Sequence, residues 1–386
     1  MINNKKKLIL VIIITAVLSS LLTLTGLYYA LGLDTHKLSN NLRFLGALRF
    51  IETQYVDQVD DTKLIDGAIA GMVKALGDQH SIYLDASMYK ELLSHTEGSF
   101  CGIGVFMGLK DNVVTVVSVM ENTPGAVAGL QAGDQILKID GADTKDMIFE
   151  QVAAKIRGEA GTSVVLLIHR EGETDKEYEI VRASIQMHSV GHDVLPHDMG
   201  YIRIASFTEN TGSEFADAYQ DLEGKGVKGL ILDLRGNPGG LLTSCVEVAN
   251  FLVPKGEIVS IVQRDGTKEI HESKLEQVKY PLVVLIDGGS ASAAEIVAGA
   301  VQDTGAGTLI GEKSYGKGSV QVVMPMYAGD ALKLTIAKYY TPSGRSIDGT
   351  GVQPDVSVAF DAAGAVDNQL LKAVEVLQSK IGVQQN

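Results

Sequence analysis

The first long apolar segment runs from Leu8 to Leu33 and contains no charged residue and no Asn, Gln or Pro. Its 26 residues would span about 39 Å as an α-helix, more than the roughly 30 Å of a membrane's hydrocarbon core. Lysines 5–7 precede it, and basic residues beside a span usually remain in the cytoplasm. Residues 1–34 are therefore predicted to be a cytoplasmic tip and a single-pass transmembrane anchor, with the body after Asp34 outside the cytoplasm. A cleaved signal peptide is the alternative, although its apolar core is usually only about 7–15 residues long.

Apolar residues after the anchor recur at helical spacing, most clearly from Leu64 to Leu76. Asp61 or Thr62 could cap this helix at its start, and Gly77 could end it. Residues 35–97 are therefore predicted to form a helical N-terminal region, whose apolar stripes we interpret as core packing.

The apolar period then changes from helical to strand-like. Residues 113–117 and 163–168 are rich in Val, Leu and Ile and predict strands. The sequence Asn-Thr-Pro-Gly at 122–125 predicts a turn, and residues 152–156 predict a short helix. A compact β-rich domain is therefore expected over residues 98–185.

The following segment alternates strand and helix. Residues 229–234, apolar except for Asp233, and the wholly apolar residues 282–286 are typical of buried strands, and each run is followed by glycines and then by a helical pattern. Such alternation favours an α/β core, with ligand loops at the carboxyl ends of its strands, over residues 186–360. The remaining residues, 361–386, are expected to hold a final helix at 366–381.

The composition is that of a folded globular protein, with 45% hydrophobic and 21% charged residues in 386. The formal net charge of −14 makes nucleic acid an unexpected partner, because phosphate binding needs a basic face. The two cysteines cannot form a disulfide framework, and no Cys-x-x-Cys occurs for zinc. Cys101 and Cys245 are expected to be buried thiols, and a disulfide between them is left open.

The segment Asp287–Glu295 predicts a strand end, a glycine turn and small residues that open a helix. A serine at such a helix start lies where backbone N–H groups and the helix dipole favour negative charge. This is the environment that an acyl-transfer nucleophile needs. Ser292 with Glu295 three residues later also fits a helix capping box, the interpretation that the residues alone favour. The residues alone leave both interpretations open.

Lys317 lies between two glycines just before a predicted strand. A lysine can act as a base for serine if burial lowers its pKa from about 10.4 toward neutrality. An exposed turn lysine is the alternative. Residues 233–240, Asp-Leu-Arg-Gly-Asn-Pro-Gly-Gly, can turn backbone amides toward an anion, or form an ordinary strand-to-helix loop.

A trypsin-like site is excluded, because no Gly-x-Ser-Gly-Gly sequence is present. His188, His192 and His197 lie close together in the chain but lack the spacing of a metal motif such as His-Glu-x-x-His. We interpret them as loop or surface residues. Neither a metal nor another cofactor is expected.

Gly102, Ile103 and Gly104 lie in the sequence Ser-Phe-Cys-Gly-Ile-Gly-Val at residues 99–105. Glycines there free the backbone to wrap a carboxylate, and the strand that follows could pair with a peptide along its edge. The three residues are therefore candidates for binding the end of a peptide.

The motifs together resemble those of the carboxyl-terminal processing (tail-specific) serine peptidases. Residues 124–141 resemble the PDZ domain of that family, 289–293 (Gly-Ser-Ala-Ser-Ala) its nucleophile motif, and 315–321 (Tyr-Gly-Lys-Gly-Ser-Val-Gln) its base motif. Residues 339–347 and 352–356 resemble the strand and tail that close its core. These motifs occur in the family's order, which is far more specific than any one of them.

A further match is Asp78–Leu84, which resembles a signature of the family's helical region. This chain has Gln79 where members often have Pro. The resemblance then extends from about Leu38 to Val358, most of the chain.

The resemblance implies a role for each candidate residue. Ser292 would be the nucleophile, Lys317 the base and Gln321 the residue that orients the base. Gly239 and Ala293 would supply the oxyanion-hole amides. The implied fold is an α/β peptidase core in the crotonase/ClpP-like style, with an inserted PDZ domain, a helical N-terminal region and one transmembrane helix.

The predicted function is that of a membrane-anchored extracytoplasmic serine endopeptidase with a Ser-Lys dyad. Its PDZ domain would select protein substrates by short, apolar, free C-termini, and Arg157 would couple PDZ occupancy to the active site. A homo-oligomer is left open. A catalytically silent PDZ peptide-binding scaffold is one rival, which the intact candidate dyad argues against. A crotonase-like acyl-CoA enzyme is another, which the PDZ-like unit and outward topology argue against.

Overall fold

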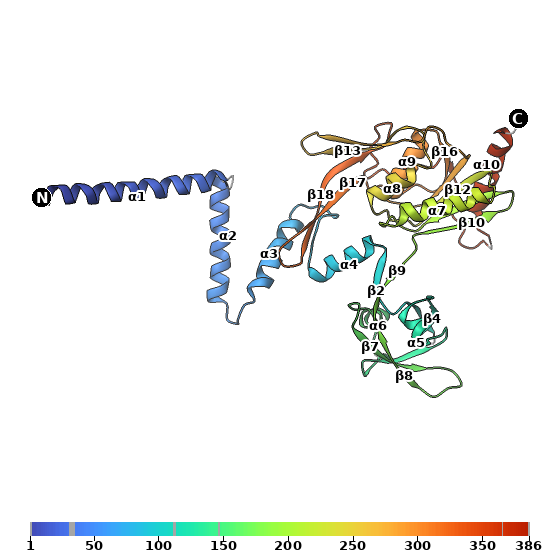
Figure 1. The fold of residues 1–386 in the computed structure, drawn as a ribbon, viewed down its shortest axis with the longest axis horizontal. Coiled ribbons are helices and arrows are strands. Elements are labelled where there is room, and N and C mark those ends of the chain that lie inside the picture. The colour runs from blue at the N-terminus through green and yellow to red at the C-terminus, as the bar shows by residue number, and fades with distance from the viewer. Residues whose placement is uncertain (1, 31–34, 111–112, 146, 365, 385–386) are drawn as a thin grey trace. The chain divides into compact units, whose positions relative to one another are not determined.

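A computed structural model describes residues 2–30, 35–110, 113–145, 147–364 and 366–384 (Figure 1). The chain divides into two compact units, Met1–Gly77 and Asp78–Asn386, which are treated separately below.

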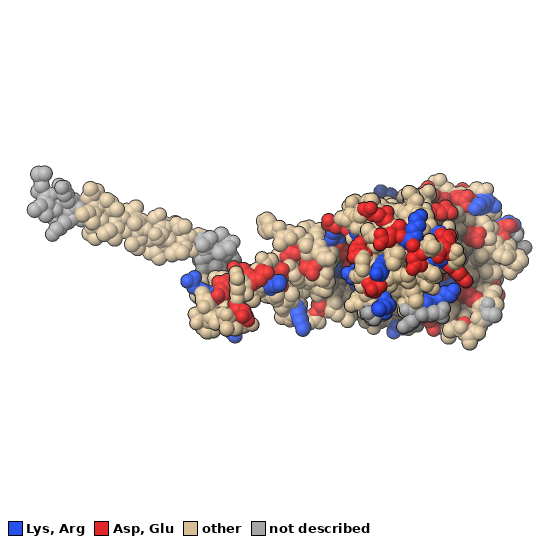
Figure 2. Space-filling view, turned by 90° about the horizontal axis from the view of Figure 1, so that it is seen from below, with Lys and Arg blue, Asp and Glu red and all other residues tan. Residues whose placement is uncertain are grey.

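The first unit begins with α1 (Ile2–Ala30), which continues the apolar pattern of the sequence. Residues Lys7–Gly26 have a mean hydropathy of 2.6 and are exposed, so this helix is long and apolar enough to cross a membrane. The face of α1 seen in Figure 2 is uncharged over most of its described length. The predicted end of the anchor, Asp34, lies outside the described residues.

Two further helices complete this unit, α2 (Thr35–Gln54) and α3 (Asp61–Lys74). The cap of α3 is Asp60, whose carboxylate accepts hydrogen bonds from the backbone N–H of Thr62 (3.0 Å) and of Lys63 (3.3 Å). The predicted caps Asp61 and Thr62 are therefore wrong, because only the residue before the first turn can reach those amides. Gly77, with φ of 68°, lies just beyond the helix end, as expected.

The apolar stripe of α2 is not packed in a core. Leu42 and Phe50 are 62% and 68% exposed, and Val73 of α3 is the buried residue of this helix pair. The prediction of core packing is thus wrong for α2 in the single chain, because two helices offer no second layer to cover the stripe.

The second unit opens with a strand that the helical pattern did not predict. β1 (Ile82–Leu84) pairs antiparallel with β18 (Ala331–Tyr340), and α4 (Ala86–Thr96) follows it. The sequence pattern missed this strand because β1 obtains its backbone partners from a strand some 250 residues away rather than from its own neighbours.

The β-rich part contains a six-stranded sheet in the order β3-β4-β5-β7-β8, with β6 paired to β5, so that β3 lies at an edge. Its core is formed by residues such as Ile136, Val164 and Leu166, and the pair β2–β9 connects it to the rest of the unit. The elements are β2 (Ser99–Gly102), β3 (Val105–Lys110), β4 (Val113–Val119), α5 (Pro124–Ala128), β5 (Gln135–Ile139), β6 (Ala142–Asp143), α6 (Phe149–Ile156), β7 (Ser163–His169), β8 (Lys176–Val181) and β9 (Ala183–Gln186).

A second six-stranded sheet, in the order β10-β11-β12-β15-β16-β19, forms the α/β core. β10 and β11 pair antiparallel, and the other neighbours pair parallel, as the strand–helix alternation predicted. Its elements are β10 (Val190–Leu195), β11 (Met199–Ile204), α7 (Thr211–Gly224), β12 (Gly229–Asp233), α8 (Leu242–Ala249), β15 (Leu282–Ile286), α9 (Ala293–Asp303), β16 (Gly307–Gly311), β19 (Val356–Ser357) and α10 (Asn368–Gln384).

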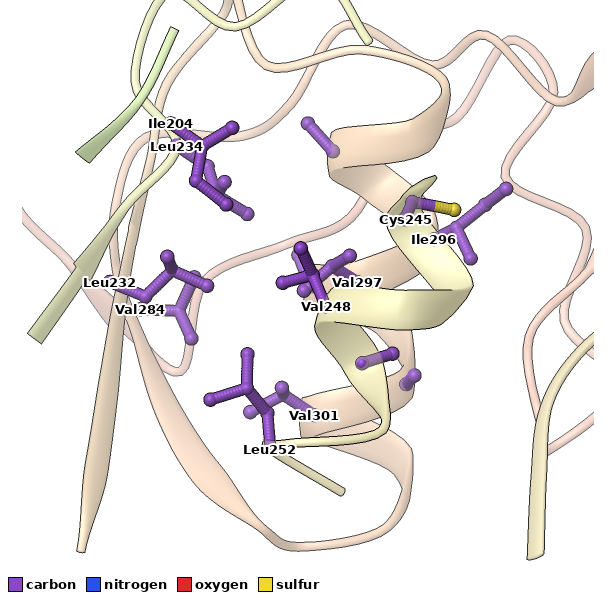
Figure 3. Packing of buried hydrophobic residues seen from close by; sticks show 14 of the residues in the cluster. Ile204, Leu232, Leu234, Cys245, Val248, Leu252, Val284, Ile296, Val297 and Val301 are labelled. Carbon is purple, nitrogen blue, oxygen red and sulfur yellow. The ribbon is translucent and has the colours of Figure 1, made fainter. Parts of the chain in front are cut away.

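Helices cover both faces of this sheet because alternate side chains of each central strand point to opposite sides. Leu232 of β12 and Val284 of β15 face Val248 and Val297 on one side, where α8 and α9 pack (Figure 3). On the other side Ile231 packs in a cluster with residues of α10. The central strands are therefore fully buried, and their carboxyl ends are held rigidly.

A third sheet joins β1, β18, β13 and β14, with β17 paired to β18. This sheet positions the candidate base, because Lys317 lies in the loop just before β17 (Ser319–Pro325). The remaining strands are β13 (Gly256–Gln263) and β14 (Lys268–Ser273). Acidic and basic side chains are interspersed over the face of this unit seen in Figure 2, which offers nucleic acid no continuous basic surface there.

Candidate active site

The loops after β12 and β15 leave the sheet at the same edge, because the two strands are parallel neighbours. They are tied to each other by backbone groups. The N–H of Gly236 donates to Asp287 Oδ1 at 2.8 Å, and the N–H of Ala291 donates to the carbonyl of Asn237 at 2.9 Å. The two glycine-containing motifs of the sequence are thus brought together.

The two serines of the second loop have different environments. Ser290 is fully buried; its Oγ donates to the carbonyl of Leu234 at 2.8 Å and accepts from the N–H of Asp287 at 3.0 Å. Ser292 is half-buried and lines a cavity. Burial therefore makes Ser290 a support of the turn and leaves Ser292 accessible to a substrate.

The backbone of Ser292 has φ of 53° and ψ of −115°, a region that costs a side-chain-bearing residue about 1–3 kcal/mol. Sharp strand-to-helix turns of this kind present nucleophilic serines in other hydrolases. The residue is also the cap of α9, and its N–H donates to Glu295 Oε2 at 2.8 Å. The cap and nucleophile interpretations consequently describe one residue and do not exclude each other.

Both candidate oxyanion residues adjoin Ser292. A Cβ at Gly239, whose φ is 96°, would lie 2.7 Å from the carbonyl oxygen of Ala291 and 2.9 Å from the nitrogen of Ala293. Ala293 begins α9, where the first backbone amides have no acceptor within the helix. The N–H of Gly239, however, donates to Asn237 Oδ1 at 2.8 Å, a bond that the sequence did not indicate.

The loop before β17 carries Lys317, whose side chain is half-buried rather than exposed. Its glycine neighbours are required by close backbone approaches. A Cβ at Gly316, which has φ of 95°, would lie 2.9 Å from the nitrogen of Gly351, and one at Gly318 would lie 2.6 Å from the nitrogen of Asp348.

Glu295 connects the lysine loop to the serine turn. Its fully buried carboxylate accepts bonds from Ser314 Oγ (2.5 Å) and from the backbone N–H groups of Gly316 (2.7 Å), Lys317 (2.9 Å) and Ser292. A buried carboxylate with this many donors is well satisfied, and removing it would leave several buried amides without partners. The sequence indicated only its capping role.

Tyr339 provides a second connection. Its buried hydroxyl lies within hydrogen-bond distance of the carbonyl of Ser292 (3.2 Å) and also donates to the carbonyl of Lys317. Burial, and then the neighbouring Glu295 carboxylate, raise the pKa of Tyr339 well above its ordinary value. The phenol therefore stays protonated and remains a donor.

The charge on Lys317 is set by four influences. Burial is the largest and lowers the pKa of the lysine, as does the positive charge of Lys333. The carboxylates of Glu295 and Asp78 oppose this lowering, and the net direction is downward. Lys333 lies on β18 and Asp78 lies before β1, so no local pattern around Lys317 could have identified either residue.

Gln321 lies on β17, and a β-bulge between Val320 and Gln321 separates it from the loop that carries Lys317. Its amide nitrogen donates to Ser319 Oγ at 2.9 Å and to Thr335 Oγ1 at 3.1 Å.

One cavity, with a volume of about 560 Å³, brings the candidate residues together. Its lining combines polar groups with apolar side chains that could receive a peptide. The candidate residues in its lining are Gly239, Ser292, Ala293, Lys317 and Gln321, and the apolar ones include Leu92, Leu241, Leu242, Ile296, Val320 and Val323.

The peptide-end candidates Gly102, Ile103 and Gly104 are buried between β2 and β3. A Cβ at Gly104 would lie 2.3 Å from Cβ of Thr123, so only glycine fits at this position. The edge strand β3 follows directly, which leaves its outer backbone groups in a position to pair with a peptide.

Arg157 caps the C-terminus of α6, away from the cavity lining. Its Nη1 lies 3.9 Å from Glu91 Oε1 on α4, and both side chains are largely exposed. A contact of this kind is weak.

The other singled-out residues do not join the site. His188 pairs with Glu214 and His192 with Asp221 at the surface, and no group of three or more potential metal ligands occurs among the described residues. Both cysteines are free. Cys245 is buried, which raises the pKa of its thiol, but Cys101 is only half-buried, contrary to the prediction.

Comparisons with known proteins extend these observations. Family models match residues 198–358 as peptidase family S41, 115–170 as a PDZ domain and 34–88 as the N-terminal domain of the activating protease CtpB. A carboxy-terminal-processing protease of Bartonella bacilliformis is 44% identical over 325 residues, 82% of this chain and 74% of that protein. The carboxy-terminal processing protease CtpA of Bacillus subtilis is 38% identical over 360 residues, 92% of this chain and 77% of that protein.

A solved structure shows the same fold. The photosystem II D1 C-terminal processing protease is 30% identical, with a TM-score of 0.50 over 87% of this chain and 96% of that chain. The fold and these relatives define a serine-type protease that carries a PDZ domain. The chain belongs to peptidase family S41, the carboxy-terminal processing proteases, which confirms the predicted resemblance.

Proposed function

We propose that this protein is a membrane-anchored endopeptidase that hydrolyses peptide bonds outside the cytoplasm with a Ser292–Lys317 dyad. The observation that carries the proposal is the shared cavity, in which an accessible serine on a strained turn lies with a lysine whose pKa is lowered by burial. A neutral lysine can take a proton, which a charged one cannot.

In the proposed reaction, Ser292 Oγ attacks the carbonyl carbon of the scissile bond while its proton passes to Lys317 Nζ. The lysine then gives that proton to the leaving amine nitrogen, and water hydrolyses the acyl-enzyme ester. Gln321 accepts a hydrogen bond from the lysine amine and orients it. The amides of Ala293 and Gly239 stabilise the oxyanion, and the Gly239 N–H must exchange Asn237 Oδ1 for the substrate oxygen to do so.

Substrate selection is proposed to use the PDZ domain. A short, apolar, free C-terminus would add as a strand beside β3, with its carboxylate at the loop formed by Gly102, Ile103 and Gly104. Amidating the tail should weaken binding, and equal cleavage of amidated and free-acid tails would contradict this part. The proposed division of the chain is 1–34 anchor, 35–97 helical region, 98–185 PDZ domain, 186–360 peptidase core and 361–386 C-terminal helix and tail.

The mechanism is tested by labelling with a serine-reactive acylating probe, followed by peptide mapping. We expect the label on Ser292 and none in Ser292→Ala. Lys317→Arg should be as inactive as Lys317→Ala, because a guanidinium does not deprotonate. A label on Ser290, or near-normal turnover of Lys317→Arg, would show that the dyad is wrong.

The membrane anchoring and outward orientation of the protein are tested separately by adding protease to intact spheroplasts. The body after Asp34 should be degraded without lysis and should remain with the membrane fraction. Protection until lysis would contradict the outward orientation, and release into the medium would contradict the anchor.

A further inference from the structure

The turn formed by Asp78 and Ser81 reaches the strand pair that carries Gln321. Ser81 Oγ donates to Asp78 Oδ2 at 2.5 Å, and the backbone N–H of Thr335 on β18 donates to Ser81 Oγ at 3.0 Å. Thr335 is the direct cross-strand partner of Gln321 in the β17–β18 register. A segment that the proposed mechanism does not use is thus joined to one of its residues.

The hydrogen bonds along this path have one direction. Hydrogen bonds from the hydroxyls of Ser81 and Thr335, and from the backbone N–H of His80, lower the pKa of Asp78 to about 2. The carboxylate is therefore ionised near neutral pH and can only accept. Ser81 gives its single hydroxyl proton to Asp78 and accepts from the backbone N–H of Thr335, and Thr335 Oγ1 accepts from Gln321 Nε2 at 3.1 Å.

These contacts hold the Gln321 amide in one orientation. Its nitrogen donates to both Ser319 Oγ and Thr335 Oγ1, so a flipped amide would need both hydroxyls to turn and become donors. With the nitrogen held toward Thr335 and Ser319, the carbonyl oxygen is free to accept from another donor. The amine of Lys317 lines the same cavity.

We propose that Asp78 and Thr335 are positioning residues for peptide hydrolysis, which act by fixing the orientation of the Gln321 side-chain amide. The carbonyl oxygen of that amide then accepts one N–H of the neutral Lys317 amine, which turns the amine's lone pair toward Ser292. This inference rests on the proposed Ser292–Lys317 mechanism.

Asp78 has a second, separable effect on the lysine. Its negative charge favours the protonated form of Lys317, as does the charge of Glu295. Burial and the positive charge of Lys333 favour the neutral form. Removing the charge should lower the pKa of Lys317 and move the acid limb of the kcat/KM profile to lower pH. A variant that only loosened the fold would not shift the limb in this direction.

The test uses the full-length protein in detergent and compares kcat and KM on one peptide substrate. Thr335→Val removes the hydroxyl while keeping the shape, and we expect kcat to fall about tenfold with little change in KM. Thr335→Ser should restore most of the rate. In a Gln321→Ala background the Thr335→Val substitution should have no further effect, because there is no amide left to orient.

A pH profile of Asp78→Asn completes the experiment, with Asp193→Asn as the matched control at an exposed position. We expect a lower plateau and an acid limb shifted to lower pH for the first variant, and a wild-type profile for the second. The proposal would be overturned if Thr335→Val lowered kcat equally in the wild-type and Gln321→Ala backgrounds. It would also be overturned if the acid limb of the kcat/KM profile were unshifted in Asp78→Asn. Full turnover of Ser292→Ala would instead overturn the mechanism on which it rests, so the two failures are distinguishable.

Discussion

The serine side and the lysine side of the candidate site are built differently. Ser292 follows a fully buried strand, and its turn is fixed by backbone groups and by buried Ser290 and Asn237. Lys317 and Gln321 are half-buried and depend on side chains from distant segments. The comparison indicates that the serine side is set by the core of the fold, whereas the lysine side can be adjusted. Changes on the first should abolish activity, whereas changes to the residues around Lys317, as distinct from the lysine itself, should alter rate and pH dependence.

The largest effect is expected at the serine side from Gly239→Ala. The new Cβ would lie 2.7 Å from both the Ala291 carbonyl oxygen and Ser292 Cβ, at a φ that disfavours any side chain. We expect kcat to fall by about 100-fold or more, the usual effect of losing an oxyanion donor. Gly288→Ala, where nothing lies within 4 Å of the new Cβ, is the control and should keep wild-type turnover. An active Gly239→Ala enzyme would show that this side is less rigid than inferred.

The connection between the two sides is tested by Glu295→Gln. An amide has only one acceptor oxygen, and its NH₂ group would face N–H donors of Ser292, Gly316 or Lys317. Each buried donor left unpaired costs about 1–3 kcal/mol, so we expect kcat to fall about 10- to 100-fold and the Tm to decrease. Glu312→Gln makes the same change at an exposed position and should be neutral in both measurements. Unchanged kcat in Glu295→Gln would mean that the two sides are aligned independently.

The lysine side is tested by Lys333→Gln. The positive charge of Lys333 lowers the pKa of Lys317, so its removal should raise that pKa and move the acid limb of kcat/KM to higher pH. Turnover should fall a few-fold near neutral pH and recover in alkaline buffer, because the base is then neutral again. Lys313→Gln, at an exposed position, serves as the control. A limb shifted to lower pH, or lost activity at every pH, would contradict a purely electrostatic role.

The smallest effect is expected outside both sides, at Arg157. Its exposed pair with Glu91, at 3.9 Å, is worth at most about 1 kcal/mol. Arg157→Ala should therefore lower turnover by about fivefold at most while tail binding to the PDZ domain is unchanged. Calorimetric titration with a tail peptide, run beside turnover assays, separates the two quantities. Weaker tail binding with normal turnover would remove Arg157 from the coupling path.

Much of the serine side could be predicted from local sequence. The runs at 229–234, where Asp233 is the one charged residue, and at 282–286 have apolar residues on both faces and form β12 and β15. The glycines and small residues after them predicted ligand loops at the carboxyl ends of these strands. That the two loops contact each other is a finding of the structure. These features are local because a buried parallel strand needs apolar residues at consecutive positions.

The sequence by itself also determined the apolar N-terminal helix, the strand–helix alternation of the core and the family to which the chain belongs. Only the tertiary structure decided that β1 is a strand, that Ser290 is buried while Ser292 is accessible, and that Lys333 and Asp78 act on Lys317. The physical reason is that periodicity and turn chemistry depend on neighbours in the chain. Desolvation and Coulomb interactions depend on distance in space, and the residues that set them come from strands and turns far apart in the sequence.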